Sequence, residues 1–366
     1  MAGSWQPGIG LALAFFLAGY AWMTHIFLSR QDPRRVPAVT RAKDDPGKGH
    51  TAAIYFTHGE PPTYDPIGWI NQFREFDEQG VAFVPFLVRP IFAYQLRKHY
   101  LIVGKSHPRD MHARMLHSLE RQYRQAGDAS TCFYRSFLDD DPRPGAAVVQ
   151  AINEGASRIV VPEVFLSISN HTAEGKHLID TLDLDAYDIP VVYTGPLYDS
   201  ELLVQMFVER AARHLDGVPK SKTGILLVGH GQPAAWDAQW PTETEHELGF
   251  RHAVHDRLAH AGYPSQNLDL AWMEFKQPKP AQVLERFMQN GVERILYFSA
   301  AISADALHSQ YDVTAMLNAA RLRPGLTTVN LGAWNDDPLV IAAIKEKIAG
   351  ALGIFSSTNN DHKTIN

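Results

Sequence analysis

Residues 57–65 read T-H-G-E-P-P-T-Y-D, and residues 229–237 read G-H-G-Q-P-A-A-W-D. Each phrase directly follows an apolar run, at residues 52–56 in the first case and 225–228 in the second. A single His-Gly pair after a predicted strand carries little information. Its recurrence in the same context indicates that one half of the chain is a copy of the other.

The copy extends further along the chain. Pro144 and Pro280 each precede a predicted helix, and Arg158 and Arg294 follow these prolines by 14 residues in both halves. A predicted strand comes next, and then a histidine that lies 13 residues after the first arginine and 14 after the second. These histidines are His171 and His308. Because the features recur in the same order, the sequence predicts a duplicated α/β unit of domain size.

Strands and helices alternate through both halves. The predicted strands are 52–56, 81–88, 130–137, 159–165 and 191–193, then 224–228, 268–273, 294–299 and 328–331. The predicted helices are 67–78, 110–125, 145–153 and 200–215, then 243–260, 281–289, 311–320 and 338–352. This alternation predicts parallel sheets with helices on both faces, in which ligands bind beyond the carboxyl ends of the strands.

The length of 366 residues allows two domains and a tail, which we expect at 51–215, 220–352 and 353–366, the last being flexible. The net charge of −6 argues against a nucleic-acid-binding protein, which would need a basic surface. The single cysteine, Cys132, excludes a disulfide within the chain and an all-cysteine metal cluster. The 17 histidines are therefore the most available metal ligands.

The N-terminus has a different character. Residues 9–28 contain no Asp, Glu, Lys or Arg, and 20 such residues at about 1.5 Å each can cross a hydrocarbon core of about 30 Å. The basic residues follow the run, which predicts a transmembrane anchor over 1–30 with the body on the cytoplasmic side. We expect a linker over 31–50. A cleaved export signal is the alternative interpretation.

The duplication also identifies candidate site residues. Neutral imidazole binds divalent transition metals and accepts protons near pH 7. A lone histidine is more commonly structural, but the repeat favours a functional role for His58, His171, His230 and His308. Glu274 lies at the end of a predicted strand and could face the same cleft, and counting along the repeat gives Leu138 as its counterpart. Asp305 and Asp312 flank His308 and could orient its ring.

One segment has no counterpart in the second half. From the repeated histidine to the helix-starting proline, the first half takes 86 residues and the second takes 50. The surplus fits residues 85–109, which mix aromatic and cationic side chains. Such a mixture suits a flat, apolar ligand that bears carboxylates, although a surface loop or an ordinary strand with charged edges would look similar.

These residues resemble the motifs of the class II tetrapyrrole chelatases, which include ferrochelatase and the sirohydrochlorin chelatases. The segments that carry the resemblance run from about residue 52 to 350 and include H-G-E-P-P (58–62), G-H-G (229–231), A-W-M-E-F-K-Q-P (271–278), S-A-D-A-L-H-S-Q-Y-D (303–312), Y-L-I-V-G-K-S-H-P (100–108) and W-N-D-D-P (334–338). Ferrochelatases place glutamate where this chain has His308, whereas cobaltochelatases have histidine there.

The resemblance implies two similar flavodoxin-like, chelatase-type domains of three layers, and insertion of a divalent metal into a tetrapyrrole. His230 would act as base and metal contact, His308 as its partner and a second metal ligand, and Glu274 would assist, with His58 and His171 as further metal ligands. Ring binding would fall to Arg89, Tyr94, Tyr100 and Ser106.

The resemblance also bears on the substrate and on rival functions. We expect Fe²⁺ and a porphyrin, with no cofactor beyond the divalent metal substrate, Fe²⁺ or Co²⁺. The alternatives are a sirohydrochlorin chelatase using cobalt, iron or nickel, and a non-catalytic haem- or metal-binding protein descended from a chelatase. The oligomeric state is left open.

Overall fold

The computed structural model describes residues 6–30, 36–78, 80 and 84–361, which divide into two compact units. The larger unit consists of the described residues of 36–62 and 106–366, and it contains the second predicted half and the first half apart from residues 63–105. The smaller unit consists of the described residues of 1–35 and 63–105.

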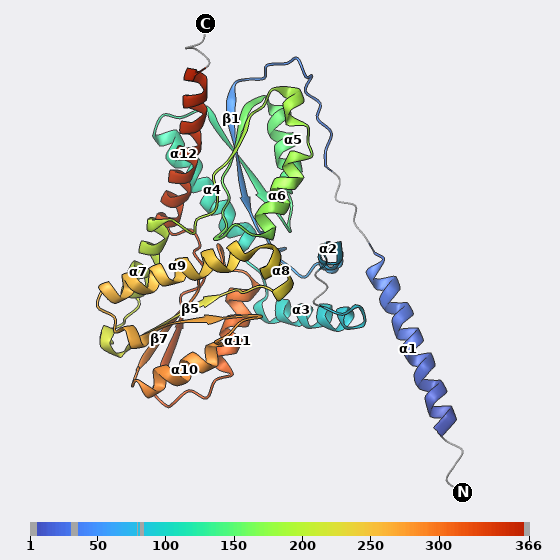
Figure 1. The fold of residues 1–366 in the computed structure, drawn as a ribbon, viewed down its shortest axis with the longest axis vertical. Coiled ribbons are helices and arrows are strands. Elements are labelled where there is room, and N and C mark those ends of the chain that lie inside the picture. Colours follow the sequence, from blue (N-terminus) through green and yellow to red (C-terminus); the bar gives the residue numbers. More distant parts are fainter. Residues whose placement is uncertain (1–5, 31–35, 79, 81–83, 362–366) are drawn as a thin grey trace. The chain divides into compact units, whose positions relative to one another are not determined.

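Two parallel four-stranded sheets form the frame of the larger unit (Figure 1). The first has the order β2-β1-β3-β4, and the second repeats it as β6-β5-β7-β8. The strands are β1 (His50–Thr57), β2 (Thr131–Phe137), β3 (Ala156–Val161), β4 (Val191–Tyr193), β5 (Thr223–Gly229), β6 (Leu268–Trp272), β7 (Arg294–Ser299) and β8 (Thr327–Asn330). The identical order confirms the predicted fold of two similar α/β halves.

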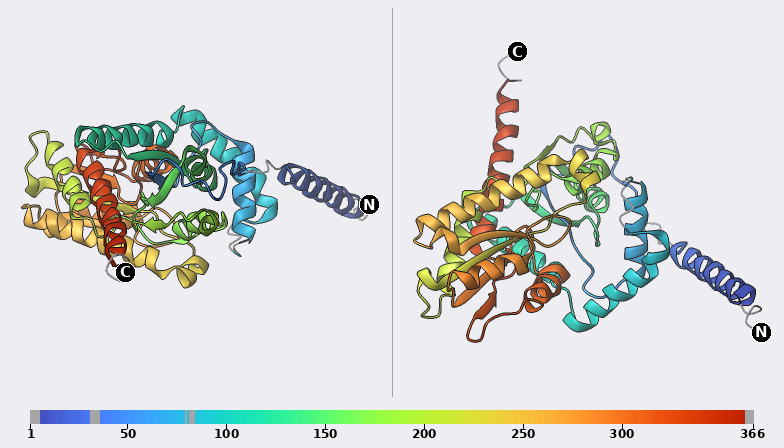
Figure 2. Two further views of the ribbon diagram at one scale, coloured as in Figure 1. Left: turned by 90° about the horizontal axis from the view of Figure 1, so that it is seen from above. Right: turned by 60° about the horizontal axis from the view of Figure 1, so that its bottom comes forward.

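Helices cover both faces of each sheet, as the views in Figure 2 show. They are α4 (Pro108–Gln125), α5 (Pro144–Glu154), α6 (Asn170–Asp180), α7 (Glu201–Arg213), α8 (Ala234–Gln239), α9 (Pro241–His260), α10 (Pro280–Gln289), the π-helix η5 (His308–Asp312), α11 (Val313–Asn318) and α12 (Pro338–Asp361), with short 3₁₀ helices η2 (Leu184–Tyr187), η3 (Lys220–Lys222) and η4 (Ser265–Asn267). Several begin with proline, whose missing N–H is harmless in the first turn. Pro144 and Pro280 of the repeat are therefore the first residues of α5 and α10.

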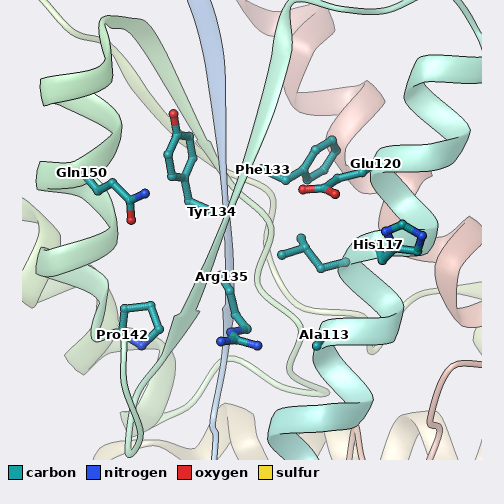
Figure 3. Close-up of a pocket in the computed structure, with 9 residues that line it drawn as sticks. Ala113, His117, Glu120, Phe133, Tyr134, Arg135, Pro142 and Gln150 are labelled. Atoms are coloured by element: carbon teal, nitrogen blue, oxygen red, sulfur yellow. The ribbon is translucent and has the colours of Figure 1, made fainter.

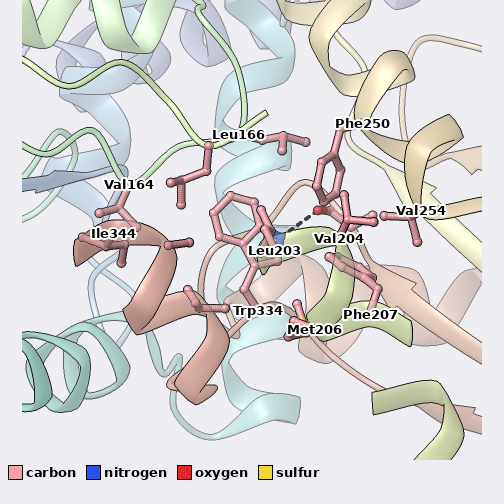
Figure 4. Packing of buried hydrophobic residues seen from close by; sticks show 14 of the residues in the cluster. Val164, Leu166, Leu203, Val204, Met206, Phe207, Phe250, Val254, Trp334 and Ile344 are labelled. Carbon is pink, nitrogen blue, oxygen red and sulfur yellow. Dashed lines mark hydrogen bonds between the residues drawn. The ribbon is translucent and has the colours of Figure 1, made fainter. Parts of the chain in front are cut away.

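The last helix of each half packs on the other half. Phe207 of α7 lies 4.8 Å, between ring centroids, from Phe298 of β7 in the second sheet. In return, α12 packs against α4 and β3 of the first half, and Figure 4 shows Ile344 of α12 beside Val164. Burial of a side chain such as Phe207 contributes roughly 1.5–3 kcal/mol. The two halves therefore share one continuous apolar core.

A second link between the halves is polar. The buried Arg210 of α7 donates hydrogen bonds to the carbonyl oxygens of Leu331 (3.1 Å), Ala333 (2.5 Å) and Trp334 (2.5 Å). Trp334, which is fully buried, donates its indole N–H to the Ala300 carbonyl at 2.8 Å. These bonds fix the segment that leads into α12 against the first half's helix.

The smaller unit contains α1 (Gln6–Leu28), α2 (Pro66–Glu78), the 3₁₀ helix η1 (Phe86–Val88) and α3 (Arg89–Val103). The Tyr20 hydroxyl of α1 donates to the Leu87 carbonyl at 2.8 Å. Among the described residues, one helical stretch, Gly10–Leu28, is long and apolar enough to cross a membrane.

One local prediction is wrong. The predicted strand at 81–88 is instead a 3₁₀ helix at residues 86–88 that leads into α3, and residues 81–83 lie outside the described part. Pro85 and Pro90 explain this, because proline cannot donate to a strand ladder but is accepted in a first helical turn. Of the predicted tail, 353–366, the residues as far as Asp361 continue α12, and the flexibility of the tail stays a prediction. Residues 362–366 of that tail lie outside the described part.

Candidate functional site

The repeated histidines follow directly after the central strands of the two sheets. His58 follows the end of β1, and His230 follows the end of β5. Nδ1 of His58 lies 2.8 Å from the Gly59 carbonyl oxygen, and Nδ1 of His230 lies 2.6 Å from that of Gly231. Because a carbonyl only accepts hydrogen bonds, this geometry places the proton of a neutral His230 ring on Nδ1 and leaves a lone pair on its Nε2.

Each of these histidines meets the second histidine of its own half. The ring centroids of His58 and His171 are 4.8 Å apart, and those of His230 and His308 are 5.2 Å apart, both edge to face. His171 stands in the first turn of α6, and His308 begins η5. The structure thus brings together both predicted pairs.

The two pairs also lie close to each other. Burial lowers the pKa of His171, and positive charge on His58 and on His230 lowers it further. The Trp236 ring of α8 lies 6.0 Å from the His171 ring, between centroids. The four histidines therefore occupy one region at the carboxyl ends of the two sheets. Among the described residues, no group of three or more His, Cys, Asp or Glu side chains is arranged to hold a metal ion together.

The two histidines of the second-half pair differ in pKa. Burial lowers the pKa of His230 to about 4, and the charge of His308 acts in the same direction. Burial also disfavours the charged form of His308, but the hydrogen bond and charge of Asp312, with the charges of Glu274 and Glu60, raise its pKa to about 9. Near pH 7 the pair thus consists of a neutral His230 and a protonated His308.

Asp312 has the orienting role that we predicted for it. Its Oδ2 lies 2.7 Å from Nδ1 of His308, one helical turn away. Asp305 instead accepts hydrogen bonds from the Ala333 N–H and the Asn335 amide, both at 2.9 Å. It therefore fixes the segment that precedes α12 rather than the His308 ring.

Glu274 joins the site from the end of β6. Its backbone N–H donates to the His230 carbonyl at 3.0 Å, and its charge acts on His308. The equivalent bond in the first half, to the His58 carbonyl at 2.9 Å, comes from Asp139. Leu138, given by counting along the repeat, is therefore the wrong counterpart by one residue. The Asp139 carboxylate lies 3.3 Å from Nε2 of His58.

Glu60, which was not among the predicted site residues, links the two halves. Its carboxylate accepts a hydrogen bond from the Ser106 hydroxyl and one from the Leu307 N–H at 3.1 Å, next to His308. Burial raises the pKa of Glu60, while these bonds and the charges of His308 and His58 oppose the shift. A usable signal was its place in the repeat, where the copy has the uncharged Gln232.

The predicted ring-binding residues have varied surroundings. Ser106 is buried in the larger unit, where it bonds to Glu60. The other three belong to the smaller unit. Arg89 is buried and forms an ion pair with Asp77, and Tyr100 is buried beside Tyr64, whereas Tyr94 is exposed.

A pocket of about 310 Å³ lies elsewhere, over the edge strand β2 between α4 and α5 (Figure 3). Its lining residues are Ala113, Leu116, His117, Glu120, Phe133, Tyr134, Arg135, Pro142 and Gln150. None of the four repeated histidines lines it.

A family model described as ferrochelatase matches residues 80–352. This chain belongs to the ferrochelatase family. Members of this family are tetrapyrrole metal chelatases, and the prediction from the sequence motifs is confirmed at that level.

Solved structures agree with the fold. SirB from Bacillus subtilis with Fe³⁺ matches with a TM-score of 0.51 and 14% identity, over 82% of this chain and 95% of SirB. SirB from Bacillus subtilis subspecies spizizenii in complex with cobalt, described as a sirohydrochlorin chelatase, gives a TM-score of 0.50 at 14% identity over the same shares. DR2241 from Deinococcus radiodurans gives 0.50 at 12%, over 81% of this chain and 54% of DR2241. No curated protein sequence matches this chain.

Proposed function

We propose that this ferrochelatase-family protein inserts Fe²⁺ into a porphyrin and uses the His230–His308 pair to do so. The observation that carries the proposal is the division of this pair into a neutral and a protonated ring, 5.2 Å apart between centroids. Metal insertion must remove the pyrrole protons of the macrocycle, and a neutral imidazole is a suitable acceptor. Nε2 of His230 is the atom that receives such a proton or contacts the metal.

The remaining groups support this chemistry. His308, held protonated by Asp312, supplies positive charge beside the carboxylates of Glu274 and Glu60. These two carboxylates offer onward sites for a proton or a hydrated metal ion. His58 and His171 stand beside them as further metal contacts. The metal is a substrate in this scheme, and no other cofactor takes part.

The charge pattern around the histidines favours a porphyrin over sirohydrochlorin, which carries more carboxylates. Two cations near the histidine loops already have acidic partners. Lys276 pairs with Asp237, and Arg143 lies 3.8 Å from Glu174. A ligand with many carboxylates would have to compete for these groups. The contrary observation is His308 itself, since cobaltochelatases resemble this chain at that position, and sirohydrochlorin is therefore the second candidate.

A metal-insertion assay tests the proposal directly. The full chain in detergent would be supplied with protoporphyrin IX or sirohydrochlorin, each with Fe²⁺ or Co²⁺, and insertion followed by absorbance. We expect the fastest insertion for Fe²⁺ with protoporphyrin IX. Insertion into sirohydrochlorin alone would replace the first candidate with the second. Binding without insertion in every combination would support a carrier and overturn both chelatase assignments.

We also propose that α1 anchors the protein in a membrane, with the body on the cytoplasmic side, and that η1 and α3 touch the same bilayer. Tyr20, inside the apolar stretch of α1, is hydrogen-bonded to η1. Outside α1, most of the exposed large apolar side chains of the described residues cluster here, at Phe86, Leu87, Val88, Ile91, Tyr94, Leu101 and Ile102. A cluster of this kind beside a spanning helix suits contact with lipid.

Fluorescence quenching can check this contact. In a Cys132→Ser background, a Leu101→Cys variant of the full chain would carry a fluorescent label in liposomes that contain brominated lipids. Leu101 is 70% exposed, and we expect its label to be strongly quenched because it lies among the acyl chains. The matched control is a label at Ile168, which is 40% exposed in the larger unit. Equal quenching at the two positions would contradict the proposal.

A further inference from the structure

A buried ion pair stands behind the His230 loop. Glu247 and Arg251 lie one turn apart on α9, both with almost no exposed surface, and Arg251 Nη2 is 4.0 Å from Glu247 Oε1. Burying an ion pair costs free energy unless further hydrogen bonds satisfy both groups, so this pair is not explained by stability alone. The contacts of the two side chains indicate another role.

The carboxylate of Glu247 holds the backbone of the histidine loop. It accepts the His230 N–H at 2.6 Å and also the Gly231 N–H. Because these N–H groups flank the His230 side chain, their bonds fix the direction in which the ring leaves the end of β5.

The guanidinium of Arg251 ties together two strand ends. It donates to the Ala271 carbonyl of β6 at 2.7 Å and to the Leu227 carbonyl of β5 at 3.3 Å. Its Cζ lies 3.9 Å from the centroid of the Trp272 ring. His230 follows β5 directly, and Glu274 follows β6. The Arg251 side chain therefore bonds to both strands that lead to these two site residues.

Gly229 makes room for this arrangement. A Cβ atom at residue 229 would lie 2.2 Å from Oε1 of Glu247 and 2.5 Å from Cζ of Arg251, which any side chain would displace. The first G of the G-H-G phrase is thus required by the buried pair rather than by a turn.

The first half has different residues at the equivalent positions. Thr57 stands where the copy has Gly229, and on α4 His112 stands where the spacing of the packed residues of α9 places Arg251. His112 contacts the hydroxyls of Tyr55 (2.9 Å) and Thr57 (3.4 Å), which form a network without an ion pair. The two copies of the histidine loop therefore rest on different supports.

We propose that Glu247 and Arg251 are positioning residues, which hold the His230 loop and the end of β6 in the geometry that metal transfer requires. This inference rests on the proposed function of His230. Neither residue needs to touch the tetrapyrrole, because both act through backbone groups. Outer groups that orient a metal-binding histidine typically change affinity or activity by about 10–100-fold when removed.

Two variants of the full chain test the proposal. Glu247→Leu combined with Arg251→Met removes both charges and leaves no orphan ion, so it should fold. We expect its kcat for metal insertion to fall by about 10–100-fold, with the KM for the porphyrin unchanged, because only the histidine loop is loosened. Glu247→Gln combined with Arg251→Met also leaves no orphan ion, keeps an acceptor for the His230 N–H, and should recover part of the lost turnover.

A stability control separates positioning from a general loss of structure. Asn267→Ala removes the buried hydrogen bond to the Ser221 carbonyl, far along the chain from the histidine loop. A wild-type kcat in the double variant, or an equal loss of kcat in Asn267→Ala, would overturn the inference.

Co²⁺ binding, followed by absorbance without any tetrapyrrole, gives an independent measurement. We expect the double variant to bind Co²⁺ about 10-fold or more weakly than wild type. If wild type inserts no metal at all, the proposed function fails, but this measurement still decides the positioning role. Equal Co²⁺ affinity in the two proteins would reject it.

Discussion

His230→Ala should reduce metal insertion by about 10²–10⁴-fold, the usual cost of losing a general base. The expected loss is in kcat, because the neutral ring removes protons from a macrocycle that other surfaces hold. Tetrapyrrole affinity, measured by absorbance titration, should change little. This split between binding and turnover distinguishes a chelatase from a carrier.

The control is His252→Ala, which removes an exposed histidine from α9. This variant should keep wild-type activity. If His230→Ala also inserted metal at the wild-type rate, the assignment of the second-half pair would be wrong. The first-half pair, His58 and His171, would then be the one to test.

The stability of the larger unit should fall steeply in mild acid because of His112. Burial lowers the pKa of this histidine from 6.5 to about 3, and the charges of Arg135 and His58 add to the effect. Its ring is enclosed by Tyr55, Thr57 and Ser303.

Below pH 6.5 the unfolded chain takes up a proton at His112 and the folded protein does not. The free energy of unfolding therefore falls as the pH drops from 6.5 towards 3, by up to about 5 kcal/mol in total. Above pH 6.5 this contribution is fully present.

The measurement is urea unfolding at a series of pH values, with His112→Gln as comparison. Glutamine preserves hydrogen bonding but does not titrate, so the slope of stability against pH should decrease by up to about 1.4 kcal/mol per pH unit. Other buried histidines, such as His230, remain in both proteins and cancel in the comparison. Identical slopes would show that His112 is protonated in the folded state as easily as in the unfolded one.

The repeat in the sequence was sufficient to predict the frame of the site. Because the two H-G phrases end the same kind of apolar run, they had to fall at the same edge of two similar sheets, and His171 and His308 followed by the same logic. Prediction failed where local composition was ambiguous. The apolar run at 81–88 suited a strand, yet residues 86–88, which prolines flank, form a 3₁₀ helix.

Other parts of the site depend on contacts between distant residues. Glu60 accepts one hydrogen bond from the Leu307 N–H, 247 residues away, and one from the Ser106 hydroxyl, 46 residues away. Only the first of these bonds links the two halves. The partner of Glu274 was misplaced by one residue because backbone bonds at the strand end, rather than counting, set the register. No local pattern encodes either relation.

The crossing of α7 and α12 has a consequence for the history of the chain. If two identical subunits exchanged their last helices by domain swapping, they would make the kinds of contact that Phe207 and Ile344 make here. Fusion of two such genes would need only a short tether, like residues 214–222, and no new interface. Once fused, each sheet depends on a helix encoded in the opposite half, so neither half can be lost alone.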